Sequence, residues 1–365
     1  MKALEISLKD WRNLAAVDFS PDAAVNIFLG HNAQGKTNIL EAINFASLLR
    51  SRAGKESDLI RWEQKSAILR IKYVKAGVAH ELAIEVSSER PRRILFDANP
   101  IRPRELIGKL NSVLFSPEDL FMFKGSPTVR RKFLDAQISQ ASPIYFLELL
   151  KYNRLVELRN ALLKKIREGS AQPAELDLWD EQLATAAEKV IIKRLLSVNK
   201  LNFLANLMQQ KISAHEENLS VVYDLRGLTS QQNLSENFLR LLRERRFDDI
   251  RRGSTSRGPH LDDLKFFVNG RELKLFGSQG QLRTTALALK LSELQFLKSE
   301  TGEYPLLLLD DVMSELDSTR REMLIEFLRR ERIQTLITAT DRAYFPPRPF
   351  GKIFSVKAGV IKWTQ

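Results

Sequence analysis

Residues 30–37 read GHNAQGKT, a run that combines two glycines with a lysine and a threonine at the spacing G-x-x-x-x-G-K-[ST]. Glycines let the backbone curl tightly enough for successive N–H groups to point at phosphate oxygens. Lys36 would then reach the β- and γ-phosphates of a nucleotide, and the Thr37 hydroxyl would hold Mg²⁺. The spacing predicts a phosphate-binding loop; the alternative is an ordinary glycine-rich turn between a strand and a helix. The residues expected to bind the nucleotide here are Gly30, Asn32, Gly35, Lys36, Thr37 and Asn38.

Two adjacent carboxylates, Asp310 and Asp311, follow four consecutive leucines at residues 306–309. Such a run is typical of a parallel strand buried on both faces, and open α/β sheets place ligands at the C-terminal ends of their strands. We expect Asp310 to bind Mg²⁺ together with Thr37, directly or through water. Asp311 is the expected catalytic base that orients and deprotonates the attacking water, and Lys36 is the second catalytic residue. The alternative is a buried strand that ends in an Asp-Asp turn.

The elements that must position these residues predict an α/β fold. A short apolar strand at residues 25–29 precedes the loop and a helix at 38–45 follows it. Further strands are expected at 306–309 and 335–338, separated by a helix over about 319–330. Because the loop and the carboxylates lie at opposite ends of the chain, folding must bring them together on one sheet.

The apolar periodicity divides the chain into three segments. Residues 1–125 alternate short strands with a helix and form a first lobe that carries the loop, and residues 263–365 form a second lobe that carries the carboxylates. Between them, residues 126–262 are expected to form an inserted helical arm, a pair of antiparallel helices. The second helix of the arm would span at most about 40 residues, or roughly 60 Å.

The charge of the chain favours a polyanionic partner. The formal net charge is +12, with basic clusters that include Arg130-Arg131-Lys132, Lys164-Lys165 with Arg167, and Arg251-Arg252. This balance predicts nucleic-acid binding, mainly through phosphates, because no helix-turn-helix or zinc module is evident. The alternative for any single cluster is a solvated helix face. Membrane-surface binding is the weaker alternative, because no amphipathic anchor with a wide apolar face is evident.

Composition also predicts the compartment. The chain has no cysteine, which excludes disulfides and thiolate metal sites. No stretch approaches 18 consecutive apolar residues, and the first residues lack a secretory apolar segment. We therefore expect a cytoplasmic protein without a membrane partner.

A third motif narrows the class of ATPase. Residues 278–281 read SQGQ before a helix over about 282–298, and they resemble the Ser-x-Gly-Gln signature of ABC-type ATPases. Residues 314–317, SELD, resemble the D-loop of the same class. In that class the signature of one subunit caps the γ-phosphate held by the loop of the other, so that two subunits enclose two ATP molecules. This resemblance assigns nucleotide contacts to Ser278, Gly280, Gln281 and Asp317. Ser278 could equally be a helix N-cap.

The chain as a whole resembles the bacterial RecF family, short relatives of the SMC and Rad50 heads. The resemblance rests on DWRN at residues 10–13, the loop with NILEA after it, FSPEDL at 115–120, RRKFLD at 130–135, RGPH at 257–260 with Asp262 and Asp263, the signature, and LDDV with SELD at 309–317. It implies an ABC-type head with two lobes on a mixed or parallel sheet and an inserted helical arm. It also implies that Arg12 and Arg52 contact the nucleotide.

The same resemblance implies the biological role. ATP with Mg²⁺ would drive homodimerisation around duplex DNA next to a single-strand gap, and slow hydrolysis would reopen the dimer. The family works with RecR and RecO to load RecA in replication, repair and the SOS response.

The chain departs from the family pattern at three places. Ala33 stands where the family usually has glycine, and Leu261 stands where the Gly-Pro-His block usually continues with arginine. None of the four histidines follows the strand at 335–340, so the switch histidine of many ABC ATPases has no counterpart. Thr340 or Asp341 is the expected substitute.

Two other functions remain as alternatives. An ABC-type ATPase coupled to a protein or membrane partner would need neither the positive charge nor the helical insertion at this place in the chain. A small-molecule kinase with a phosphate loop would act as a monomer and would not use the signature or the D-loop.

Overall fold

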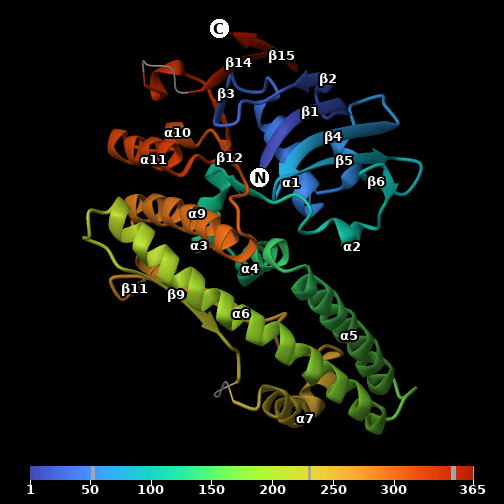
Figure 1. Cartoon of the computed structure of the whole chain (residues 1–365). Helices are drawn as coiled ribbons and strands as arrows, with labels where there is room; N and C mark the ends of the chain where they lie inside the picture. Colours follow the sequence, from blue (N-terminus) through green and yellow to red (C-terminus); the bar gives the residue numbers. More distant parts are fainter. Residues whose placement is uncertain (51–53, 229–231, 347–350, 365) are drawn as a thin grey trace. The chain divides into compact units, whose positions relative to one another are not determined.

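The computed structural model describes residues 1–50, 54–228, 232–346 and 351–364. They form two compact units, each built from segments that are distant in sequence (Figure 1). The first unit comprises Met1–Leu120, Lys211–Ala214 and Arg283–Gln365, and the second comprises Phe121–Gln210 and His215–Leu282.

An antiparallel sheet in the order β2-β1-β4-β5-β6-β7 forms one layer of the first unit. Along β4, Ala67, Leu69, Ile71 and Tyr73 are buried while the residues between them are more exposed, as expected for a sheet with one covered face. The strands are β1 (Lys2–Trp11), β2 (Leu14–Phe19), β4 (Ser66–Lys75), β5 (Val78–Ser87), β6 (Arg93–Phe96) and β7 (Asn99–Pro100).

The second sheet of this unit carries the strands that surround the loop and the carboxylates. Its order is β15-β14-β3-β13-β12-β8, and all neighbouring pairs are parallel except β14 with β15. Every residue of β12 and of β13 is buried, which explains their uninterrupted apolar runs. The strands are β3 (Val25–Leu29), β8 (Ser112–Phe115), β12 (Leu306–Asp310), β13 (Thr335–Ala339), β14 (Lys352–Lys357) and β15 (Val360–Thr364).

Helix α1 (Lys36–Leu48) packs between the two sheets. One hydrophobic core joins Leu8 of β1, Ile43 of α1 and Leu308 of β12. Trp11 at the end of β1 meets Phe45 of α1 edge to face, with ring centroids 5.6 Å apart. The other helices of the unit are α2 (Pro103–Leu106), α10 (Val312–Glu315), α11 (Ser318–Glu331), η1 (Glu56–Leu59), η2 (Pro117–Leu120), η4 (Arg342–Tyr344) and most of α9 (Gln279–Thr301).

The second unit is mainly helical, with one small antiparallel sheet in the order β11-β10-β9. Ser142 ends α4 and caps α5, where its side chain accepts a hydrogen bond from Tyr145 N at 3.4 Å. No helix in the described ranges is long and apolar enough to cross a membrane. The elements are α3 (Phe121–Lys124), α4 (Pro127–Ala141), α5 (Pro143–Arg167), η3 (Pro173–Glu175), α6 (Leu176–Ile212), α7 (Leu234–Arg252), α8 (Leu273–Phe276), β9 (Leu219–Asp224), β10 (Asp263–Val268) and β11 (Arg271–Glu272).

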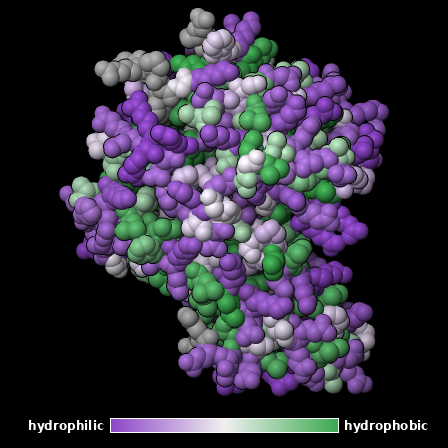
Figure 2. Space-filling view, in the orientation of Figure 1, coloured by the Kyte–Doolittle hydropathy of each residue, from purple (hydrophilic) through white to green (hydrophobic). Residues whose placement is uncertain are grey.

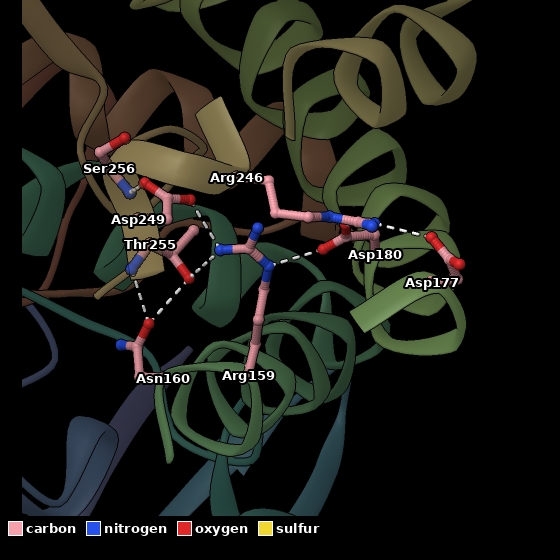
Figure 3. A network of polar contacts seen from close by, with 8 residues as sticks. All are labelled: Arg159, Asn160, Asp177, Asp180, Arg246, Asp249, Thr255 and Ser256. Atoms are coloured by element: carbon pink, nitrogen blue, oxygen red, sulfur yellow. Dashed lines mark hydrogen bonds and ion pairs between the residues drawn. The ribbon is translucent and has the colours of Figure 1, made fainter. Parts of the chain in front are cut away.

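Buried ion pairs hold the long helices of this unit together (Figure 3). Arg159 of α5 is fully buried; its Nε donates to Asp180 Oδ1 of α6 at 2.6 Å, and its Nη1 donates to Asp249 Oδ2 of α7 at 2.8 Å. The same Nη1 donates to Thr255 Oγ1 at 2.9 Å, and Arg246 Nη2 of α7 donates to Asp180 Oδ2 at 2.7 Å. Because each carboxylate oxygen of Asp180 faces a different arginine, removal of either cation would leave one buried oxygen of Asp180 without its partner.

The Gly-Pro-His block lies in the interior of the same unit. Gly258 adopts φ +126, and a Cβ there would lie 2.5 Å from the Tyr152 hydroxyl oxygen. Tyr152 OH is 2.6 Å from His260 Nδ1, and the buried Arg194 donates from Nη1 to Pro259 O at 2.6 Å. Leu261, where the family usually has arginine, is half-buried and closes a turn through Leu261 N to Gly258 O at 2.8 Å. In this chain the block therefore organises the fold of the second unit.

The two units divide the chain differently from the three predicted segments. The second lobe was expected from residue 263, but β10, β11, α8 and the first residues of α9 belong to the second unit. The physical reason is strand pairing, because β10 pairs with β9 from Asp263 opposite Asp224 to Val268 opposite Leu219. Phe266 of β10 also meets Phe123 edge to face, with ring centroids 5.1 Å apart.

Candidate nucleotide-binding site

The predicted loop joins the end of β3 to the start of α1. Gly35 precedes α1 with φ +102, and Ala33 adopts φ +63 although it is not glycine. Left-handed backbone costs an alanine about 1–2 kcal/mol, so the surrounding contacts impose this conformation. Gly30 packs so closely on β14 that a Cβ would lie 2.3 Å from Val356 O. The two loop glycines therefore satisfy two different needs, a close approach at residue 30 and a left-handed turn at residue 35.

Lys36 reaches back over the loop. Its Nζ donates to Gly30 O at 2.6 Å and to His31 O at 2.7 Å. Burial lowers the pKa of Lys36, while Asp311 and Asp310 partly oppose that shift. An ammonium held at this place would meet the terminal phosphates of a bound nucleoside triphosphate.

The carboxylate of Asp310 receives two threonine hydroxyls. Thr37 Oγ1 of α1 donates to Asp310 Oδ1 at 2.9 Å, and Thr338 Oγ1 of β13 donates to the same oxygen at 2.7 Å. The parallel register sets Asp310 beside Thr338 in neighbouring strands. Folding thus brings the predicted Thr37–Asp310 pair into direct contact across most of the sequence.

Asp311 has a different environment. Its backbone is left-handed, with φ +52, and its N–H donates to Thr338 Oγ1 at 2.9 Å. Its Oδ1 is buried without a hydrogen-bond partner, and burial raises the pKa of Asp311. An unpaired, buried carboxylate oxygen is suited to accept a proton from a water molecule that enters the site.

These groups line a common cavity of about 290 Å³. Its wall combines backbone of the loop, one ammonium, two carboxylates and two threonine hydroxyls, a set that can bind phosphate and a divalent cation. The lining residues are Asn32, Ala33, Gly35, Lys36, Thr37, Asn38, Asp310, Asp311 and Thr338.

The donor set fits Mg²⁺ held jointly with a nucleotide. Thr37 Oγ1 and Asp310 Oδ1 are hard oxygen ligands at hydrogen-bonding distance from each other. No group of three or more His, Cys, Asp or Glu side chains that could hold a metal occurs in the part of the chain that the structure describes. Mg²⁺ commonly binds through one or two carboxylates and completes its shell with water and substrate phosphate, which is what this pair provides.

Arg12 lies beside the start of α1. Its Nη1 donates to Asn38 Oδ1 at 2.9 Å and is 2.7 Å from Glu41 Oε2. Asn38 Nδ2 in turn donates to Asn13 Oδ1 at 2.7 Å, so the turn between β1 and β2 is fastened to the end of the loop. The other predicted arginine, Arg52, lies outside the described residues.

The signature residues belong to the second unit and form a helix cap there. Gln281 N donates to Ser278 Oγ at 3.2 Å, and Ser278 N donates to Gln281 Oε1 at 3.1 Å, the reciprocal bonds of a capping box. Ser278 and Gly280 are exposed. Asp317 caps α11 by accepting from Arg320 N at 2.9 Å and pairs with the Arg320 guanidinium; these contacts lower the pKa of Asp317. None of these four residues lines the cavity.

Two residues at the site were missed in the sequence. Thr338 lies in the wall of the cavity, whereas the expected switch substitutes do not: Thr340 is exposed and Asp341 caps η4 by accepting from Ala343 N at 2.8 Å. Asn13 lies against Gly35, whose added Cβ would come within 2.8 Å of Asn13 Oδ1. Asn13 lies in the DWRN segment, which indicates the family but not a contact with the loop. For Thr338, the signal in the sequence is a polar residue within a buried strand.

The basic clusters separate into interior and surface groups. Arg130 is buried and donates from Nε and Nη2 to the two oxygens of Asp263 at 2.7 and 2.8 Å, and Arg131 Nη1 donates to Asp262 O at 2.7 Å. By contrast, the C-terminal ends of α5 and α7 meet at the surface, where Arg167 Nη1 lies 3.4 Å from Arg252 O. We call this surface group the α5–α7 basic end; its residues are Lys164, Lys165, Arg167, Arg251 and Arg252.

Comparison with known proteins identifies chains that are similar to this one. Residues 3–358 match the RecF/RecN/SMC N-terminal domain. The chain is similar to the DNA replication and repair protein RecF of Halothermothrix orenii, with 42% identity over 98% of this chain and 97% of the relative. It is also similar to the protein of the same name from Heliobacterium modesticaldum, with 40% identity over 99% of this chain and 98% of the relative.

The fold of this chain is also similar to a solved structure. The structure of the recombination mediator protein RecF with ATP in the RecFOR pathway superposes with a TM-score of 0.92. That protein is 34% identical, and the match covers 100% of this chain and 98% of the other.

Proposed function

Because the chain belongs to the RecF family, we propose that two copies of it close on ATP and Mg²⁺ to hold DNA beside a single-strand gap. Family membership makes the chain a recombination mediator ATPase with an ABC-type head. The predicted family and α/β fold class are confirmed. An ATPase coupled to a membrane or other partner is not favoured.

One observation carries the nucleotide part of the proposal. Lys36 and Thr37 from the loop meet Asp310 and Asp311 from the other end of the chain around one cavity. The loop backbone and Lys36 would hold the β- and γ-phosphates. Thr37 and Asp310 would hold Mg²⁺, which supplies charge neutralisation on the phosphates when bound. Asn38 and Arg12, which are hydrogen-bonded to each other beside the loop, would also contact the nucleotide.

Asp311 would act as the base in hydrolysis. Its Oδ1, buried without a hydrogen-bond partner, would accept a hydrogen bond from the attacking water. It would take the proton of that water as the water oxygen bonds to the γ-phosphorus and the bond from the γ-phosphorus to the β-phosphate oxygen breaks, with ADP as the leaving group. Thr338 holds the backbone N–H of Asp311 and the carboxylate of Asp310 at once, so it would fix the distance between the metal ligand and the base.

The exposed signature supports closure by a second copy. Ser278 and Gly280 are exposed, and the N-terminus of a long helix favours an anion. In the proposed dimer Ser278, Gly280 and Gln281 of one copy would contact the γ-phosphate bound to the other, and Asp317 would also contact a nucleotide. Arg52 would complete the contacts to the nucleotide.

DNA contact would be mainly to phosphates. The α5–α7 basic end gathers five exposed basic residues at two helix ends that contact each other, which supports sequence-independent and salt-sensitive binding. Together with RecR and RecO the dimer would load RecA in the cytoplasm, as the family resemblance implies.

The function is tested by binding of a fluorescent gapped duplex with and without ATP–Mg²⁺, for the unchanged protein and for Lys36→Ala. We expect tight binding only with ATP, weakened by rising salt and lost in Lys36→Ala. The proposal would be refuted if the affinity for DNA were the same with and without ATP and the same in Lys36→Ala as in the unchanged protein. Lys165→Glu should weaken DNA binding without changing ATP binding, whereas Lys357→Glu, an exposed lysine outside the α5–α7 basic end, should leave both unchanged.

A further inference from the structure

Arg320 connects the D-loop to the helix that carries the signature. It is the third residue of α11, which begins directly after the D-loop, and Thr284 lies on α9 three residues beyond Gln281. The Arg320 guanidinium donates to Thr284 Oγ1 from Nη2 at 2.7 Å and from Nε at 3.0 Å. Both residues belong to the first unit, so the contact is internal to that unit.

The same guanidinium also holds Asp317, the last residue of the D-loop. Arg320 Nη1 pairs with Asp317 Oδ2, and Asp317 Oδ1 accepts from Arg320 N at 2.9 Å. The planar guanidinium presents its donors in fixed and diverging directions, whereas a lysine presents all of its donors from one nitrogen. One arginine therefore serves a hydroxyl on α9 and the carboxylate that caps α11 at the same time.

Burial distinguishes this contact from the other arginine contacts of the surface. The face of the molecule in Figure 2 is mostly hydrophilic, so an arginine at the surface carries no information by itself. Arg283 and Glu315, 2.9 Å apart, also join α9 to the D-loop, but their side chains are 46% and 35% exposed, and exposed ion pairs contribute little. Thr284 is only 1% exposed, and a hydrogen bond between a charged donor and a buried group is costly to lose.

We propose that Arg320 is a positioning residue that holds the signature and the D-loop of one copy in a single arrangement, ready to meet the nucleotides of the closed dimer. This inference rests on the proposed function, in which Ser278 contacts the γ-phosphate bound to the other copy and Asp317 also contacts a nucleotide. Groups that are already held in their bound arrangement lose less free energy to ordering when two chains associate. Loss of the Arg320 contact should therefore weaken closure of the dimer.

The position of Arg320 separates closure from nucleotide binding. Arg320 does not line the cavity that holds Lys36, Thr37 and the two aspartates. The affinity of a single copy for ATP should therefore not depend on it. A variant that lacks the Arg320 contact should bind ATP as a monomer and require a higher protein concentration to dimerise.

Sedimentation equilibrium in ATP–Mg²⁺, with Asp311→Asn in every sample to prevent turnover, measures the dissociation constant of the dimer. Arg320→Ala should raise it roughly tenfold or more. Calorimetric titration at a protein concentration where the chain is monomeric should find the affinity for ATP unchanged. Arg330→Ala is the matched control, because Arg330 is an exposed arginine of the same helix whose Nε donates to the adjacent Glu331 at 3.1 Å, and it should dimerise normally.

Thr284 gives an independent check with its own control. Thr284→Val should weaken the dimer about as much as Arg320→Ala, and the combined variant should be no weaker than either single variant, because both remove one contact. Thr284→Ser keeps the hydroxyl and should restore dimerisation. Thr285→Val is the control, because it removes an equally buried hydroxyl from the same helix, one without a hydrogen-bond partner among the described residues, and it should leave the dimer unchanged.

The results distinguish the role of Arg320 from the proposed function. If the Asp311→Asn protein dimerises with ATP and Arg320→Ala does so equally well, the role of Arg320 is overturned and the proposed function stands. Additive effects of Arg320→Ala and Thr284→Val, or a loss of ATP affinity in monomeric Thr284→Val, would also overturn it. If the Asp311→Asn protein does not dimerise with ATP, the proposed function fails, and the role of Arg320 fails with it.

Discussion

The hydroxyl of Thr338 donates to Asp310 Oδ1 at 2.7 Å while accepting from Asp311 N at 2.9 Å. One fully buried hydroxyl therefore fixes the two carboxylates that the proposed hydrolysis uses. Because both hydrogen bonds of its hydroxyl join it to these two aspartates, we assign Thr338 the role of a positioning residue.

Replacing this hydroxyl should slow hydrolysis more than it weakens ATP binding. We expect Thr338→Val to lower kcat roughly 10- to 100-fold, as loss of such supporting contacts does, and to raise the Mg²⁺ concentration needed for half-maximal rate. Thr338→Ser should restore both. Thr335→Val is the control, because it removes a hydroxyl of equal burial from the same strand, one that donates to Ile333 O at 3.0 Å. Equal effects of both valine variants would mean that the Thr338 contribution is only structural.

Removal of the proposed base should separate binding from hydrolysis. Asp311→Asn keeps the shape of the side chain but cannot take the proton, so hydrolysis should fall by roughly 10²–10⁴-fold while ATP still binds. ATP-bound dimers should then persist, which a stopped-flow dissociation assay measures. Asp341→Asn, at an exposed cap, should hydrolyse ATP at the normal rate; normal turnover in Asp311→Asn would exclude it as the base.

Two glycines with left-handed backbone, Gly35 inside the loop and Gly77 outside it, allow a matched test of what the loop requires. Gly35 has φ +102 and Gly77 has φ +80, so Gly→Ala at either should cost about 1 kcal/mol or more from left-handed strain. Only at Gly35 does the new Cβ meet neighbours, with Asn13 Oδ1 and Leu14 Cδ2 at 2.8 Å, whereas nothing lies within 4 Å at Gly77. Calorimetric titration should find ATP binding lost in Gly35→Ala and kept in Gly77→Ala.

Much of the site could be predicted because its signals are local. The loop spacing and the leucine run before Asp310 are contiguous, and both lie where expected, at the end of β3 and at the end of β12. The strands and the helix after the loop were also correct to within a few residues.

What could not be predicted depends on register. Thr338 meets Asp310 only because β12 and β13 are parallel with those two residues paired, which no spacing in the sequence reveals. The start of the second lobe was displaced for a similar reason, since the pairing of β10 with β9 is a long-range choice. Arg130 looked like part of a DNA-binding cluster because its buried partner, Asp263, is distant in sequence.

The buried histidine of the Gly-Pro-His block should make stability depend on pH. Burial, together with Arg131 and Arg194, lowers the pKa of His260, while the Thr255 carbonyl opposes this. Unfolded histidine binds its proton near pH 6.5, but folded His260 does so only at lower pH, so the unfolded state holds more protons below that value. The free energy of unfolding should therefore fall as pH drops from about 7 to 5.

Urea unfolding across this pH range measures the effect. His260→Asn should flatten the pH dependence, and His215→Asn, at an exposed position, should not. Stability that rises on acidification, or a slope unchanged by His260→Asn, would show that this histidine does not titrate as its burial indicates.

The central claim is that ATP closes two copies on DNA, and mass in solution tests it most directly. With ATP–Mg²⁺ the mass should double and gapped duplex should be captured; Ser278→Arg should still bind ATP but remain a monomer, because the arginine occupies the place of the partner's γ-phosphate. The account would be contradicted by a mass that is the same with and without ATP–Mg²⁺, or by a Ser278→Arg variant that dimerises with ATP as the unchanged protein does.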